Sequence, residues 1–134
     1  MLLDSLLSFG LFFMTAMAVG ALFLFLYALV TPYDDYKLIF EDKNTAAAIG
    51  FGGAIMGLSI PLYSALTHSV SYADFAVWAI VAMLIQLVFA FIMTRTKGKY
   101  SVTKLIDEGV VSAGILMAFI SICIGLLNAG SMSY

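Results

Sequence analysis

Residues Thr45–Leu66 read TAAAIGFGGAIMGLSIPLYSAL and include no Asp, Glu, Lys or Arg. An apolar run of about 20 residues is long enough to cross the hydrocarbon core of a bilayer as a helix. Backbone groups in lipid need hydrogen-bond partners within their own segment, which a helix provides; barrel strands would instead alternate polar and apolar residues. We therefore expect a transmembrane helix here.

Three further stretches are equally apolar and uncharged: Leu6–Val30, Phe75–Met93 and Val110–Ala129. The whole chain is 63% hydrophobic and 10% charged, whereas a soluble domain is about 25% charged. No Lys or Arg precedes the first stretch, so we expect a retained helix there rather than a secretory signal. The prediction is an all-α polytopic membrane protein with four transmembrane helices.

The cations are confined to the two linkers that follow the first and third stretches. Cytoplasmic loops of membrane proteins carry the excess of Lys and Arg. Both linkers are therefore expected in the cytoplasm, and the N- and C-termini on the other, non-cytoplasmic side. The six cations are Lys37, Lys43, Arg95, Lys97, Lys99 and Lys104.

The two linkers also resemble each other in sequence. The pattern Tyr-x3-Lys-Leu-Ile-x-Glu-x4-Ala starts at Tyr33 and again at Tyr100, 67 residues later in a chain of 134. We interpret this as a duplication of a two-helix unit, residues 1–67 and 68–134, within one membrane domain. A two-helix unit returns the chain to its starting side, so the repeats would be parallel, related by an axis along the membrane normal. The mixed apolar and charged linkers predict short interfacial helices.

Small residues recur along one face of the second stretch, where Gly53-x3-Gly57 is a small-x3-small motif that lets another helix come close. The fourth stretch repeats this design more weakly. Pro61 removes a helical hydrogen bond and is expected to kink the helix. These faces could serve packing within the chain, a subunit interface or a pore lining. The residues expected there are Gly50, Gly53, Gly57, Pro61, Gly114 and Gly125.

The linkers hold acids just before the second and fourth stretches. Asn44 is a predicted N-cap, and Asp42 and Asp107 would favour the positive ends of the following helices. Each repeated Glu follows a Lys by four residues, a spacing that allows an ion pair or the binding of a partner protein. The linker residues singled out are Lys37, Glu41, Asn44, Lys104 and Glu108.

The four apolar stretches contain few side chains that could act in catalysis or bind a ligand. Gln86 is the only amide well inside a span, and no span holds an Asp, Glu, Lys or Arg, which argues against proton-coupled transport or a charged substrate at the midplane. His68 and Cys123 are the only residues of their types, so a site of several His or Cys ligands is not expected. We predict no enzyme activity, no metal or cofactor, no nucleic-acid partner and no identifiable small-molecule substrate.

The run Lys43–Gly57, followed by Pro61, resembles a bacterial inner-membrane family of unknown function, the YjfL-like proteins (domain-of-unknown-function 350). The shared hallmarks are length, four spans, two repeats and an Asn-x-Ala-x-Ala stretch leading into glycines. The second repeat departs from this motif, with Val111 aligned to Asn44 and Met117 aligned to Gly50. The resemblance implies a bacterial plasma membrane and a role in a larger envelope system, but no activity.

Two functional hypotheses follow. The first is a non-enzymatic module that oligomerises or docks partner proteins through its glycine-rich faces and linkers, in an envelope-stress system; a further, separate option is an integral subunit of an enzyme complex. The alternative is an oligomeric channel or small transporter with an uncharged pore, since hydroxyls and backbone carbonyls can select solutes without charge. Four helices hardly enclose a wide pore, so this alternative requires several copies.

Overall fold

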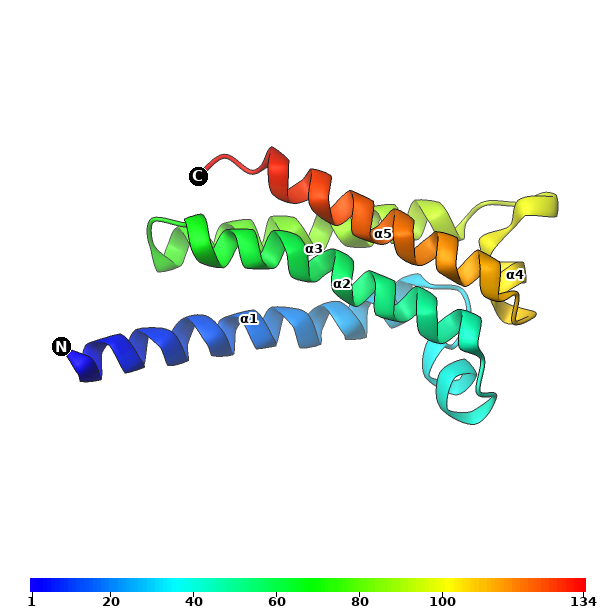
Figure 1. Cartoon of the computed structure of the whole chain (residues 1–134), viewed down its shortest axis with the longest axis horizontal. Helices are drawn as coiled ribbons and strands as arrows, with labels where there is room; N and C mark the ends of the chain where they lie inside the picture. Colours follow the sequence, from blue (N-terminus) through cyan, green and yellow to red (C-terminus); the bar gives the residue numbers. More distant parts are fainter.

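A computed structural model describes all 134 residues, and its secondary structure is entirely helical. Four long helices form the body (Figure 1): α1 (Leu2–Val30), α2 (Thr45–His68), α3 (Tyr72–Thr94) and α5 (Val111–Ser131). All four are long and apolar enough to cross a membrane. The prediction of an all-α chain with four such helices is confirmed. The observed helix bounds differ from the predicted ones mainly because polar residues at the ends continue the helices.

Short helical segments occupy both linkers, at the same end of the molecule (Figure 1). The first linker holds η1 (Lys37–Glu41), a π-helical turn, and the second holds η2 (Gly98–Tyr100), a 3-10 turn, followed by α4 (Val102–Asp107). Helical segments in the linkers were expected from their mixed composition. Their position at a membrane interface stays a prediction, as does the duplication.

Helices α2 and α5 both start at the linker end and run parallel, in the most extensive contact between any two elements (Figure 1). Ala46 faces Gly114 near the two helix starts, and Gly57 faces Gly125 further along. Helix α3 packs against α1, α2 and α5, and α1 contacts α2 and α3. Helix α1 is thus the most peripheral of the four.

The N-terminal part of α1 projects beyond the other helices (Figure 1). Its 29 residues span about 43 Å at 1.5 Å per residue, compared with roughly 30 Å of hydrocarbon. Leu2, Leu6 and Phe9 are more than half exposed. Such an exposed apolar surface suits lipid, not water.

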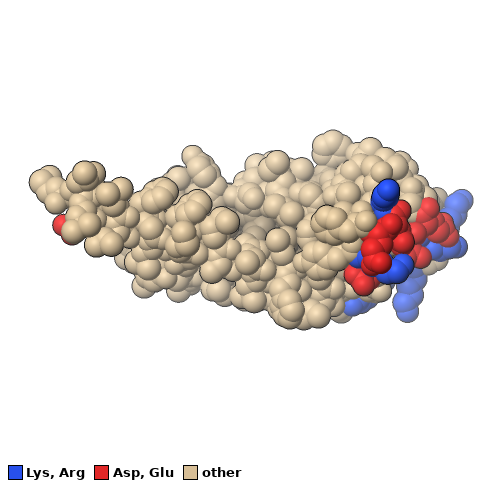
Figure 2. All heavy atoms as spheres, turned by 90° about the horizontal axis from the view of Figure 1, so that it is seen from below, with Lys and Arg blue, Asp and Glu red and all other residues tan.

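Charge is concentrated at the linker end of the molecule. On the face that Figure 2 shows, Lys, Arg and acidic side chains lie together at this end, and an acidic side chain is visible at the opposite end. Both termini lie at the end opposite the linkers (Figure 1). The structure therefore separates the cationic linkers from the chain ends, as the charge pattern predicts.

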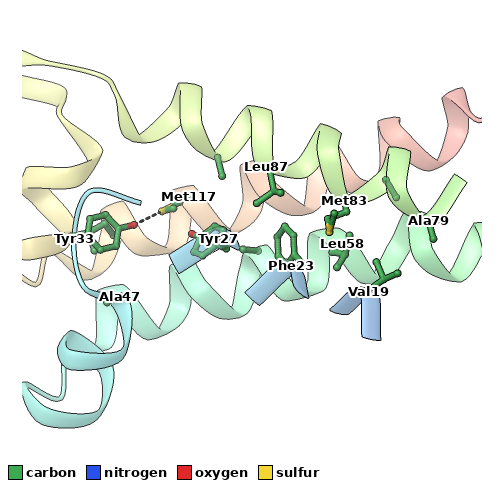
Figure 3. Packing of buried hydrophobic residues seen from close by; sticks show 14 of the residues in the cluster. Val19, Phe23, Tyr27, Tyr33, Ala47, Leu58, Ala79, Met83, Leu87 and Met117 are labelled. Atoms are coloured by element: carbon green, nitrogen blue, oxygen red, sulfur yellow. Dashed lines mark hydrogen bonds between the residues drawn. The ribbon is translucent and has the colours of Figure 1, made fainter. Parts of the chain in front are cut away.

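The core lies between α1, α2 and α3, where aromatic and aliphatic side chains interleave (Figure 3). The ring of Tyr27 is 5.7 Å from that of Phe23 and 5.5 Å from that of Phe51. Leu58 and Met83 fill the adjoining space and are at most 4% exposed. This core packs α1 against the rest of the bundle and fixes the end of α1 from which the first linker starts.

Candidate functional site

The glycine faces of α2 and α5 meet inside one chain. A methyl group added to Gly53 would collide with the backbone of Ala118, and one added to Gly125 would collide with the carbonyl of Gly57. A methyl group on Gly114 would likewise collide with the carbonyl of Ala46. Glycine is thus required here because two helix backbones approach closely. Of the three roles considered for these faces, the structure displays packing within the chain.

Gly50 and Pro61 lie on the same helix but have different surroundings. A Cβ atom on Gly50 would lie 3.1 Å from the sulfur of Met117, so Gly50 provides room for a side chain rather than a backbone. Pro61 is buried, and α2 continues on both sides of it as a helix. The glycines and the proline predicted for packing are all buried in α2 or α5.

Two buried amides link α3 to α5 at the middle of the bundle. The Gln86 side chain donates to the Ser121 carbonyl oxygen at 3.3 Å. The Asn128 amide donates to the Ala82 carbonyl oxygen at 3.2 Å and to Gln86 Oε1 at 3.4 Å. A methyl group on Gly57 would lie 2.7 Å from Gln86 Nε2, so this glycine makes room for the amide as well. The amides of Gln86 and Asn128 therefore satisfy each other and backbone carbonyls of α3 and α5.

Asn44 connects the two linkers. Its side-chain oxygen accepts from the backbone N–H of Ala47 at 3.0 Å, which confirms the predicted N-cap of α2. Its amide nitrogen donates to the Ile106 carbonyl oxygen at 2.7 Å, at the end of α4. One side chain thus caps a helix of the first half and holds the linker of the second.

The predicted Lys–Glu spacing does not produce ion pairs. Lys37 Nζ lies 3.2 Å from Asp42 Oδ2 instead of bonding Glu41, because the π-helical turn of η1 brings residues five apart together. This contact raises the pKa of Lys37 through the hydrogen bond and charge of Asp42. Lys104 and Glu108 form no ion pair, since α4 ends at Asp107.

Asp107 does not cap the fourth span, and the favourable effect of its charge on the positive end of that helix stays a prediction. The N-cap of α5 is Val110, whose side chain makes no capping bond. Gly109 has a φ of +80° and turns the chain between α4 and α5. Asp107 is the last residue of α4, and Glu108 is its C-cap.

Residues of both linkers surround one polar hollow of about 400 Å³, called here the linker hollow. An adjoining polar hollow of about 370 Å³ shares Leu38, Asp42 and Asp107 with it. Charges of both signs are present, so the surface can form ion pairs and hydrogen bonds with a bound group. The linker hollow is lined by Pro32, Tyr33, Asp34, Lys37, Leu38, Asp42, Ser101, Thr103, Lys104 and Asp107.

A buried carboxyl group lies in the loop beside this hollow. Asp35 is 1% exposed, and its Oδ2 accepts a hydrogen bond from Thr31 Oγ1 at 2.5 Å. Its Oδ1 has no partner. Burial raises the pKa of Asp35 to about 6, because a carboxylate is poorly solvated away from water. Burial raises the pKa of the neighbouring Tyr33 as well.

Sequence reasoning did not find Asp35. It stands beside Asp34 in the run Thr31-Pro32-Tyr33-Asp34-Asp35, and neither acid was singled out in the sequence. Only the fold separates them, since Asp34 is exposed and Asp35 is buried. No local pattern distinguishes the two; the turn-forming Thr31-Pro32 pair is the sole hint that the chain folds back here.

Comparison with known proteins agrees with the resemblance. The family model "Domain of Unknown Function (DUF350)" matches residues 1–132. The UPF0719 inner membrane protein YjfL of Escherichia coli (strain K12) is 35% identical over 133 residues, which cover 99% of this chain and 98% of that protein. The protein of the same name from Escherichia coli O157:H7 matches equally. No solved structure matches significantly. The chain belongs to the DUF350 family.

Proposed function

We propose that this chain is a non-enzymatic, multi-pass protein of the bacterial inner membrane whose linkers form one cytoplasmic docking surface for a partner protein. The inner-membrane part is supported by the family and by the relative named an inner membrane protein. The cytoplasmic placement of the linkers is supported by the six cations they carry. A docking role of this kind requires no catalytic group. We place this role in an envelope-stress system.

The observation that carries the proposal is that residues of two linkers, about 60 positions apart in sequence, line one polar hollow. Two structural features hold the linkers together. The close α2–α5 contact fixes the points at which both linkers enter the bundle, and the Asn44 amide bonds the Ile106 carbonyl across them. A surface assembled from two segments on rigid helices is preorganised, and preorganisation reduces the entropic cost of binding.

Homo-oligomerisation is a separate part of the proposal, and it must use other surfaces. The glycine faces are occupied within the chain, whereas α1 is largely uncovered. An apolar groove of about 340 Å³ runs between α1 and α2, lined by residues that include Ala16, Gly20, Ile55 and Leu62. A methyl group added to Gly20 would have no neighbour within 4 Å. We propose this side of α1 as the contact in any homo-oligomer.

The docking proposal is tested by affinity purification from gently solubilised membranes of the native host, without crosslinking. The tagged wild-type chain is compared with a Lys104→Ala/Asp107→Ala double variant of the linker hollow and with Asp4→Ala, a charge change at the opposite end. We expect one soluble protein to be retained by the wild type and by Asp4→Ala, and at least about tenfold less with the double variant, equivalent to about 1.4 kcal/mol. Equal retention by all three chains would contradict the proposal.

A further inference from the structure

Asp35 lies in a loop that is part of the linker hollow itself. Residues 31–36, called here loop 31–36, connect the end of α1 to η1, and the last two of them, Asp35 and Tyr36, already form the helical turn that leads into η1. Pro32, Tyr33 and Asp34 line the hollow. Asp35, the next residue, is buried and does not line it. The position of this loop therefore sets one wall of the docking surface.

The surroundings of Asp35 favour a neutral carboxyl group. The ionisable groups that interact electrostatically with Asp35 are Tyr27 from α1 and Tyr33 and Asp34 from its own loop. None of these is a cation, and no Lys or Arg forms an ion pair with Asp35. Thr31 provides the one side-chain hydrogen bond to the carboxyl group, and Oδ1 has none. A buried carboxylate without a cation or a full set of donors is strongly disfavoured.

Beside the edge-to-face contact of the Tyr36 ring with the ring of Phe51 on α2 at 5.8 Å, the side-chain hydrogen bonds between the loop and the bundle are weak. The Tyr33 hydroxyl donates to the sulfur of Met117 on α5 at 3.6 Å (Figure 3), and sulfur is a poor acceptor. The hydroxyl of Tyr27, buried nearby, has no hydrogen-bond partner. The loop is thus fixed to the bundle chiefly by burial, and a charge within it can shift the balance between its packed and released positions.

We propose that Asp35 is a proton-binding residue whose neutral form holds loop 31–36 against the bundle and whose ionised form releases it, so that protonation regulates the docking surface. The regulatory consequence rests on the docking function proposed above, but the loop movement does not. The proton is taken from and returned to the cytoplasmic solution, and no other group changes its bonds.

The direction of the pH effect follows from burial. A carboxyl group whose pKa is higher when buried binds its proton more tightly in the packed loop than in the released loop. The packed position is therefore favoured at acidic pH, and this advantage is lost as the pH rises through about 6, the value to which burial raises the pKa of Asp35. At neutral pH the ionised residue favours release.

Hydrogen–deuterium exchange of the purified full-length chain in lipid nanodiscs tests this, over pH 5 to 8, with rates corrected for intrinsic exchange at each pH. In the wild type we expect peptides covering residues 31–41 to exchange more slowly at pH 5 than at pH 8. Asp35→Asn, which mimics the neutral carboxyl group, should keep slow exchange across the range. The matched control is Asp34→Asn, which changes the exposed neighbouring acid. This variant should keep a pH response, with its midpoint moved to lower pH because the charge of Asp34 raises the pKa of Asp35.

Thr31→Val provides a second variant with a distinct readout. The Thr31 hydroxyl hydrogen-bonds the carboxyl group and thereby lowers the pKa of Asp35. Its removal should move the midpoint of the exchange change to higher pH. A wild-type loop without pH response, or a response that persists in Asp35→Asn, would overturn the inference. No partner protein is present in this measurement, so its outcome is independent of whether the docking proposal holds.

Discussion

Gly50 of α2 and Met117 of α5 face each other across the helix contact, and they are the residues that align when the two halves of the sequence are compared. The absence of a side chain on Gly50 leaves space for the Met117 thioether, with 3.1 Å between the sulfur and the Cβ position of residue 50. The same sulfur accepts the hydrogen bond of Tyr33, the residue two positions before Asp35. The glycine-rich face is thus connected directly to the loop of the linker hollow.

Gly53→Ala should destabilise the protein, whereas Gly52→Ala should not. The added methyl group at position 53 would overlap the Ala118 backbone, and forcing such overlap costs about 1–3 kcal/mol. Gly52 has no neighbour within 4 Å of its Cβ position, so alanine there should be neutral or slightly stabilising. Thermal unfolding in one detergent measures both variants. Equal melting temperatures would show that α2 and α5 do not approach as described.

The amides of Gln86 and Asn128 should be energetically coupled. A double-mutant cycle with Gln86→Met and Asn128→Leu removes their mutual hydrogen bond and both bonds to backbone carbonyls. Polar contacts between membrane helices are worth about 0.6 kcal/mol on average and up to about 1.7, and we expect a coupling energy in that range. Unfolding in detergent with a denaturant provides the four free energies. Strict additivity would contradict the contact.

Asn44→Ala should cost more than the loss of a helix cap alone. The change removes the N-cap of α2, worth about 1 kcal/mol, and the bond to the Ile106 carbonyl, worth about another 1 kcal/mol. Asn44→Ser can still cap the helix but is too short to reach Ile106, so it should recover about half of the loss. If serine restored full stability, the connection between the linkers would carry no energy.

The stability of the wild type should decrease as the pH rises from 5 to 7. Burial raises the pKa of Asp35 to about 6 from an unfolded value of 3.8, so the unfolded chain releases this proton at lower pH than the folded chain does. At 1.36 kcal/mol per pKa unit, the difference in stability between pH 5 and pH 7 is about 1 kcal/mol. Asp35→Asn should remove this component, as judged by unfolding curves of both chains at the two pH values. An equal or larger pH effect in the variant would contradict the burial of this carboxyl group.

The sequence predicts the spans well because membrane helices are defined by uncharged length, a property that needs no knowledge of their neighbours. The helix that packs against a glycine face cannot be predicted in this way, since Gly53 and Gly57 allow close contact with any helix, from the same chain or another. Asp35 was missed for a related reason: its burial is created when the loop folds onto α1, and nothing in its local sequence differs from that of Asp34. The ion pair of Lys37 was assigned to the wrong acid because a π-helical turn changes the spacing. The channel hypothesis stays a prediction, and a measurement of solute flux in liposomes tests it.

Helices α2 and α5 pack in parallel within one chain and thereby place the two linkers side by side. Cysteines at Asp42 and Asp107, which line both polar hollows, test it most directly in a Cys123→Ser background. A short bismaleimide crosslinker is applied to a mixture of ¹⁵N-labelled and unlabelled copies in nanodiscs, and the products are identified by mass spectrometry. We expect crosslinks between cysteines of the same isotopic label, and none for a control pair of Asp42→Cys with Ser133→Cys. Crosslinks that join labelled to unlabelled chains, or no crosslink at all, would contradict it.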